Sequence, residues 1–136
     1  MKDDCIFCKL ANGIIPTKSI YEDELFNVIM DAEPATKGHV LIIPKKHYDS
    51  LFDLGDEEAK AIMPLAKKLA TKIKADLSAD GYNLVQNNGK IANQTVKHFH
   101  LHLIPRYEGD CNQGQISWNH VEITEEEMNE VYQIIK

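Results

Sequence analysis

The sequence predicts an α+β fold, with an antiparallel five-stranded sheet, one long helix and a C-terminal helix. Short apolar segments separated by turn residues predict the strands, at residues 19–21, 25–31, 40–43, 82–86 and 94–106. Residues 56–77 form the one long segment with helical periodicity. Most of the predicted strands are neighbours along the chain, which favours an antiparallel sheet.

Turn-forming and capping residues mark the boundaries of the predicted elements. Residues 5–10 read as a turn or short helical piece, and Glu22-Asp23-Glu24 forms the turn of a predicted hairpin. Pro44 ends the third strand. Thr124 and Glu127 predict a capping box that opens the last helix. The long helix has an apolar stripe made of Ala59, Ile62, Ala66, Leu69, Ile73 and Leu77.

The composition is that of an ordinary soluble protein. The chain has 136 residues, of which 43% are hydrophobic and 26% charged, and no linker divides it, so we expect one domain over residues 1–136. The net charge of −6 argues against a nucleic-acid polymer as partner. The absence of a long apolar run argues against a membrane, and the absence of an export signal favours a cytoplasmic protein.

The functional segment is Gln94 to Arg106, where His98, His100 and His102 alternate with Phe99, Leu101 and Leu103. We expect one extended strand, stopped by Pro105, with the three imidazoles on one face and the apolar side chains on the other. Three interpretations are open: a merely polar face, a catalytic metal site, or a phosphate site with an imidazole nucleophile. The spacing by itself does not choose between the last two.

This segment resembles the histidine-triad family of nucleotide hydrolases and transferases, which carry a His-x-His-x-His motif. The resemblance continues in residues 38–47, which end in Pro44-Lys45-Lys46-His47, and in the segment from Cys5 to Glu24. Matching landmarks run from about residue 5 to residue 106, so residues 107–136 are expected to be a C-terminal extension. The resemblance implies a histidine-triad fold and a homodimer with joined sheets.

The resemblance assigns catalytic roles to three residues. His100 is expected to attack the α-phosphorus and form a nucleotidyl-histidine, since a neutral imidazole needs no prior deprotonation. Its other ring nitrogen needs an acceptor, which we expect to be a backbone carbonyl. His102 is expected to bind a phosphate oxygen, and Thr95 to pass a proton to the leaving group.

The remaining nucleotide contacts are also implied by the resemblance. Asp31 matches the acidic ribose ligand, and the phosphate is expected at Asn87, Gln94 and Thr95 together with His100 and His102. An apolar slot for a purine base is expected from Ile6, Phe7 and Leu10, with Phe26 as a further candidate. Trp118 is a candidate to close over a site of its own or of a partner subunit.

Cys5 and Cys8 form a Cys-x-x-Cys pair, which favours metal or thiol chemistry in a chain without an export signal. By the resemblance, His47 and His98 complete a tetrahedral set for a structural zinc ion. The alternative is two buried thiols beside two hydrogen-bonded histidines. We expect no organic cofactor, a free thiol at Cys111, and structural or solvent-facing roles for His39 and His120.

The function expected is therefore cleavage at the α-phosphorus of a nucleoside phosphoramidate or acyl-nucleotide. Two alternatives stay open: hydrolysis of dinucleoside polyphosphates, and a regulatory nucleotide-binding module with vestigial catalysis. A zinc hydrolase that uses the triad as catalytic ligands is a third.

Overall fold

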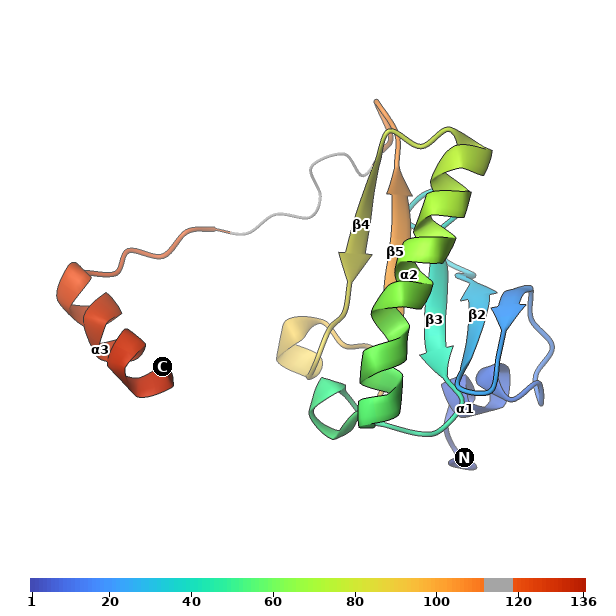
Figure 1. Cartoon of the computed structure of the whole chain (residues 1–136), viewed down its shortest axis with the longest axis horizontal. Helices are drawn as coiled ribbons and strands as arrows, with labels where there is room; N and C mark the ends of the chain where they lie inside the picture. Colours follow the sequence, from blue (N-terminus) through green and yellow to red (C-terminus); the bar gives the residue numbers. More distant parts are fainter. Residues whose placement is uncertain (112–118) are drawn as a thin grey trace.

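The computed structural model describes residues 1–111 and 119–136, so Trp118 lies outside the described residues. Five antiparallel strands form one sheet in the order β1-β2-β3-β5-β4 (Figure 1). The strands are β1 (Ser19–Glu22), β2 (Phe26–Met30), β3 (Val40–Pro44), β4 (Gly81–Val85) and β5 (Leu101–Arg106). The helices are α1 (Ile6–Ala11), α2 (Asp56–Leu77) and α3 (Glu125–Ile135), with short 3-10 turns η1 (Leu51–Asp53) and η2 (Lys90–Ala92). The predicted fold class is confirmed.

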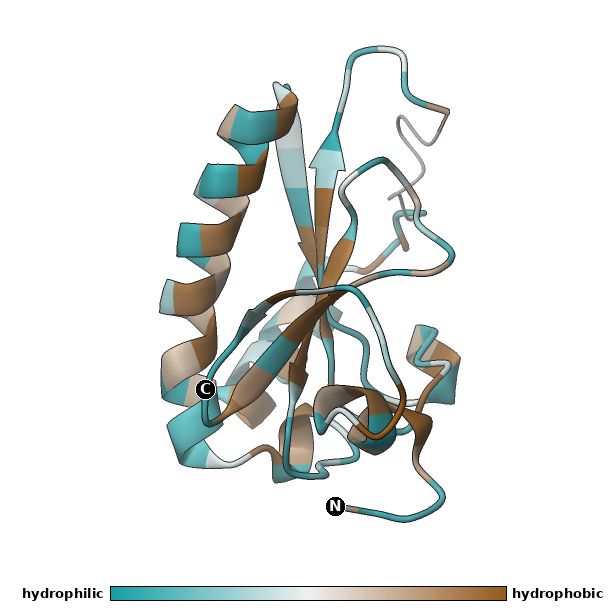
Figure 2. Cartoon of the chain, turned by 90° about the vertical axis from the view of Figure 1, so that its right-hand side faces the viewer, coloured by the Kyte–Doolittle hydropathy of each residue, from teal (hydrophilic) through white to brown (hydrophobic). Residues whose placement is uncertain are grey.

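The sheet separates two apolar layers, because alternate residues of a strand face opposite sides. In β3, Val40 and Ile42 belong to the main core under α2, whereas Leu41 and Ile43 pack with α1 on the other face. The long helix turns its apolar side toward the sheet and its polar side outward (Figure 2). The chemistry-bearing histidines lie on the α1 side of this sheet.

Helix α2 has the predicted bounds, but its buried stripe is shifted. Leu65 is buried, although the predicted stripe omits it, while Ala59 is exposed and Leu77 is 39% exposed. Glu58 is also buried, and its carboxylate accepts a hydrogen bond of 2.6 Å from the Tyr48 hydroxyl. This bond raises the pKa of Tyr48 to about 12. A satisfied carboxylate can therefore occupy a position that apolar periodicity leaves unassigned.

The predicted extent of the histidine strand was wrong. Strand β5 begins at Leu101, so only His102 of the three lies in it, and the strand continues through Pro105. Proline is tolerated because the ladder with β3 ends at Leu103, where only β4 remains as a neighbour. The alternation of faces still holds, because Phe99, like Leu103, joins the main core.

The C-terminal segment ends in α3, whose predicted capping box is present. The hydroxyl of Thr124 accepts the backbone N–H of Glu127 at 3.1 Å, and the Glu127 carboxylate accepts the Thr124 N–H at 3.4 Å. Among the described residues α3 contacts no other helix or strand, and Figure 1 shows it well away from the sheet. No helix in residues 1–111 or 119–136 has the length and apolar character needed to cross a membrane.

A pair of opposed leucines in β5 and β4 allows a direct test of the core. Leu103 is fully buried in β5, and Leu84, directly opposite in β4, is 43% exposed. We expect Leu103→Ala to lower the free energy of unfolding by about 2–5 kcal/mol because it leaves a cavity. Leu84→Ala is the control and should cost less than about 1 kcal/mol. Urea denaturation measures both, and equal losses would contradict the difference in burial between the two leucines.

Candidate active site and metal-ligand cluster

His100 lies directly before β5 and is 6% exposed. Its Nδ1 is 2.7 Å from the backbone carbonyl oxygen of His98. A carbonyl can only accept, so Nδ1 carries the proton and Nε2 keeps its lone pair. Burial lowers the pKa of His100, which favours the neutral ring. The geometry thus leaves a neutral imidazole nitrogen free to act as a nucleophile, and the carbonyl expected to fix its tautomer is that of His98.

His102 carries its ring proton on Nε2, whereas His100 carries it on Nδ1. Two successive hydrogen bonds, from Ala35 to His39 and from His39 to His102, determine this difference. The backbone N–H of Ala35 donates to Nδ1 of His39 at 2.9 Å, so the proton of neutral His39 is on Nε2. That Nε2 is 2.9 Å from Nδ1 of His102, which therefore accepts. The remaining nitrogen of His102, Nε2, must then carry a proton in the neutral ring.

The two rings are neighbours, with centroids 5.0 Å apart. Burial, with smaller contributions from the adjacent His100 and His39, lowers the pKa of His102 to about 4. Both rings are consequently neutral near pH 7 in the protein without ligand. One offers a lone pair and the other an N–H group, which is what attack on phosphorus and binding of a phosphate oxygen require.

Of the two roles expected for His39, structural or solvent-facing, the structure agrees with the structural one and adds a contact with His102. His39 is buried, and besides His102 its Nε2 lies 3.4 Å from Oδ2 of Asp31. The sequence contained a pattern that indicates this position of His39. The residue is separated by two and four positions from Leu41 and Ile43, which face α1, so its side chain is expected on the same face. This spacing alone would therefore have placed His39 on the histidine face of the sheet.

Asp31 directly follows β2 and is half-buried beside His39. Its Oδ1 accepts the backbone N–H of Glu33 at 2.8 Å, which holds the carboxylate at the start of the loop. The predicted ribose ligand and the predicted phosphate-binding histidine are thus brought together, although they are 71 positions apart in sequence.

The residues predicted to form the base slot lie on or beside α1. Phe7 and Leu10 are half-buried against the second core cluster, and Ile6 is 53% exposed. The Phe7 ring meets the His100 ring edge-on, with centroids 4.9 Å apart. Phe26 was wrongly included, because it is fully buried in the main core under α2.

The loop between β4 and the histidine segment is organised by Gln94. Its amide nitrogen donates to the carbonyls of Asp49 at 2.6 Å and Val96 at 3.0 Å, and its amide oxygen accepts the N–H of Gly89 at 2.8 Å. Gln94 therefore holds the loop in shape with its whole amide group. Asn87 adds a longer bond of 3.3 Å to the carbonyl of Asn93.

Thr95 follows Gln94 and borders a hollow of about 670 Å³ beside the loop. Lys90 and Lys97 line the same hollow and make it electropositive. Thr95 also borders a second hollow toward Cys5 and His47. This residue thus lies between a surface suited to an anion and the cluster of thiols and histidines.

Cys5, Cys8, His47 and His98 form that cluster, which we call the thiol–histidine cluster. Nδ1 of His98 lies 3.3 Å from Sγ of Cys5 and 3.4 Å from Sγ of Cys8, and Nδ1 of His47 lies 3.4 Å from Sγ of Cys8. All four donor atoms are within 4.8 Å of one another. Cys5 is the N-cap of α1 and Cys8 lies in α1, while His47 and His98 lie after β3 and before β5.

The outer hydrogen bonds of the cluster fit a metal ion. Nε2 of His98 is 2.9 Å from the carbonyl of Pro44, and Nε2 of His47 is 2.7 Å from Oδ1 of Asp49. Both rings therefore carry their proton on the outer nitrogen and turn a lone pair inward, as ligating histidines do. Asp49 is a supporting residue that sequence reasoning missed. Burial lowers the pKa of His98 to about 4, which keeps its lone pair available.

Asp31, His39 and His102 form a second group of possible ligands with similarly close donor atoms. Its hydrogen bonds do not fit a metal, because the Ala35 N–H occupies Nδ1 of His39 and leaves a proton on the nitrogen that faces the group. The tautomers thus distinguish a group suited to a cation from one that is not, within one sheet face.

Comparison with known proteins agrees with this geometry. The model of the HIT domain matches residues 12–109. The chain is 40% identical over 124 residues to an adenosine 5'-monophosphoramidase of Schizosaccharomyces pombe, an alignment that covers 91% of this chain and 90% of the relative.

Two crystal structures extend the comparison. A HIT family protein from Bacillus anthracis superposes with a TM-score of 0.89 at 42% identity, covering 99% of this chain and 96% of the other. A zinc-bound histidine triad family protein from Mycobacterium smegmatis gives a TM-score of 0.75 at 38% identity, with 93% and 88% covered. The chain therefore belongs to the family of HIT domain proteins.

Proposed function

We propose that this protein is a nucleotide hydrolase or nucleotidyl transferase that cleaves at the α-phosphorus through a nucleotidyl-histidine at His100. The observation that carries the proposal is the opposite protonation of two adjacent rings: a lone pair on Nε2 of His100 and a proton on Nε2 of His102. Relatives named adenosine 5'-monophosphoramidase support a nucleotide derivative as substrate.

The reaction has two steps in this proposal. Nε2 of His100 attacks the α-phosphorus, the N–P bond forms, and the bond from phosphorus to the leaving group breaks. The leaving group takes a proton by way of the Thr95 hydroxyl, while the N–H of His102 binds a non-bridging oxygen on which charge develops. Water then attacks phosphorus and gives up a proton that restores the Thr95 hydroxyl, the N–P bond breaks, and a nucleoside monophosphate leaves.

The rest of the pocket would hold the nucleotide in place. The carboxylate of Asp31 is suited to the two ribose hydroxyls, and the apolar surface of Ile6, Phe7 and Leu10 to a purine base. Asn87 and the backbone of the Gln94 loop would contact the phosphate. Contacts of this kind orient the phosphorus toward His100 without strong selection among bases.

The proposed substrate is a nucleoside phosphoramidate or an acyl-nucleotide. Parallel rates on an adenosine phosphoramidate, an adenylylated lysine and a diadenosine polyphosphate separate this from dinucleoside polyphosphate hydrolysis. A regulatory module would bind the nucleotide and turn over none of the three. We keep the homodimer and the cytoplasmic location that the sequence suggests as parts of the proposal.

A structural zinc ion in the thiol–histidine cluster belongs to the same proposal. Two thiols and two imidazole lone pairs would form a closed tetrahedral set around the ion, and a zinc-bound relative supports it. Zinc would hold α1 against the histidine segment. It would leave His100 and His102 free, which distinguishes this arrangement from a zinc hydrolase.

Replacing the nucleophile is the decisive test. We expect His100→Asn to lower kcat/KM on an adenosine phosphoramidate by at least about 10³-fold, because no covalent intermediate can form. Rapid quenching of the unmodified protein should yield a burst of nucleotidylated chain that the variant lacks. His120→Asn, at an exposed position, is the matched control. A burst that persists in His100→Asn refutes the assigned nucleophile.

The metal prediction concerns the two cysteines of α1. Cys5→Ser and Cys8→Ser should each lose most of the bound zinc and lower the Tm, since a four-ligand site would lose a ligand. Elemental analysis of purified protein and calorimetry measure the two effects. Cys111→Ser, which removes an exposed free thiol, should change neither. Retention of stoichiometric metal without Cys5 and Cys8 would favour the zinc-hydrolase alternative.

His39 is predicted to be a positioning residue for His102. His39→Leu removes the N–H that sets the tautomer of His102 and should lower kcat about 10- to 100-fold, with a smaller change in KM. Nitrogen NMR of the ring should show the His102 proton distributed over both nitrogens. His39→Gln retains a donor and should recover part of kcat. An unchanged His102 spectrum in the Leu variant would disprove the role.

A further inference from the structure

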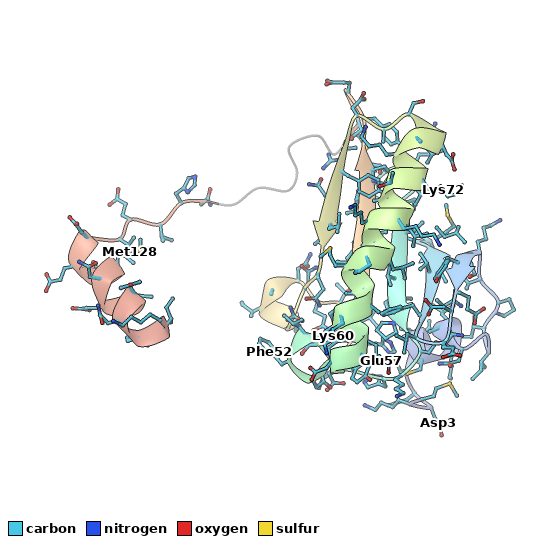
Figure 3. The ribbon with its side chains drawn as sticks, in the orientation of Figure 1. Asp3, Phe52, Glu57, Lys60, Lys72 and Met128 are labelled. Carbon is cyan, nitrogen blue, oxygen red and sulfur yellow. The ribbon has the colours of Figure 1, made fainter. Side chains whose placement is uncertain are left out.

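The last helix presents an apolar face that no other element in residues 1–111 or 119–136 covers. Met128, Val131, Tyr132 and Ile135 recur at three- and four-residue steps and are 43–76% exposed. Figure 3 shows Met128 on a helix that stands apart from the body of the molecule. An isolated helix of this length is marginal in water, so its stability requires a surface to pack against.

The body of the molecule has an open apolar groove of suitable character. It lies between α2 and the outer strands and has a volume of about 310 Å³. Its apolar lining includes three side chains that are 37–44% exposed, Ile20, Met30 and Leu77, together with the half-buried Ile73. Such a contiguous apolar surface on a folded domain is typical of a binding site.

The charges of the two surfaces are complementary. Residues 66–77 of α2 contain Lys67, Lys68, Lys72 and Lys74 against one acidic residue, Asp76. Lys72 lines the groove together with Asp76, and the two form an ion pair (Figure 3 labels Lys72 on α2). The basic excess of this segment is therefore that of Lys67, Lys68 and Lys74. Residues 125–135 of α3 contain four glutamates and no basic residue. Docking α3 on this groove would set acidic side chains beside basic ones.

We propose that α3 of one copy of this chain packs into the groove of a second copy, and that the exchange is reciprocal. In the structure α3 is extended away from its own α2, so the helix and the groove of one chain are both left uncovered (Figure 1). A two-fold pairing covers two helices and two grooves at once and leaves none open, which closes the assembly. This inference rests on the proposed homodimer and names the helix that each copy contributes to the other; it is independent of catalysis.

Paired cysteines test the proposal in the full-length protein. Ile73→Cys in the groove is combined with Val131→Cys on α3, in a Cys111→Ser background that removes the exposed native thiol. A short bis-maleimide at micromolar protein concentration should then give a covalent dimer on a denaturing gel. The matched control is Met63→Cys with Val131→Cys, because Met63 is a 57% exposed residue of α2 that does not line the groove.

The expected yield of covalent dimer is at least roughly tenfold above the control, because a docked pair of thiols has a high effective concentration. Circular dichroism checks that both double variants fold. An internally linked monomer would overturn the proposal, since α3 would then cover its own groove. A yield equal to that of the Met63 control would also overturn the proposal, because α3 would then not bind the groove in preference to the rest of α2.

Discussion

The hydrogen bond from Nδ1 of His100 to the backbone carbonyl of His98 is the constraint on which the candidate site depends. It fixes the tautomer of the proposed nucleophile, and its acceptor belongs to a residue that is itself held firmly. The His98 ring is fully buried between the thiols of α1 and the carbonyl of Pro44. Whatever holds the His98 ring therefore also orients the lone pair of His100.

Burying an imidazole costs free energy unless its ring nitrogens have hydrogen-bond or ligand partners. On this sheet face the histidines meet that requirement with two different patterns of protonation. In the thiol–histidine cluster, protons point outward and lone pairs inward, which suits a cation. In the pair of His39 and His102, one N–H satisfies the next ring and leaves the last proton facing the pocket. Adjacent residues on one sheet face thus present inward lone pairs in one group and an N–H group facing the pocket in the other.

Prediction from sequence succeeded where a periodic pattern directly expresses burial. The alternation at Phe99 and Leu103 identified the core side of the histidine segment, and the three- and four-residue steps gave the bounds of α2. Prediction failed where a hydrogen-bond partner or a neighbouring strand determines burial or the extent of an element. Glu58 is buried because the Tyr48 hydroxyl satisfies it, and β5 continues through Pro105 because β3 no longer pairs with the strand there.

The sequence by itself determined the fold class, because local periodicity and turn residues express it. The order of its motifs carried the family resemblance, which implied the residue types that meet at the site. Only the tertiary structure decided which nitrogen of each histidine carries a proton. That choice depends on Ala35, Pro44 and Asp49, whose N–H, carbonyl and carboxylate groups have no distinctive pattern in the sequence. Hydrogen-bond partners distant in sequence set the chemistry of an imidazole, and folding alone brings them together.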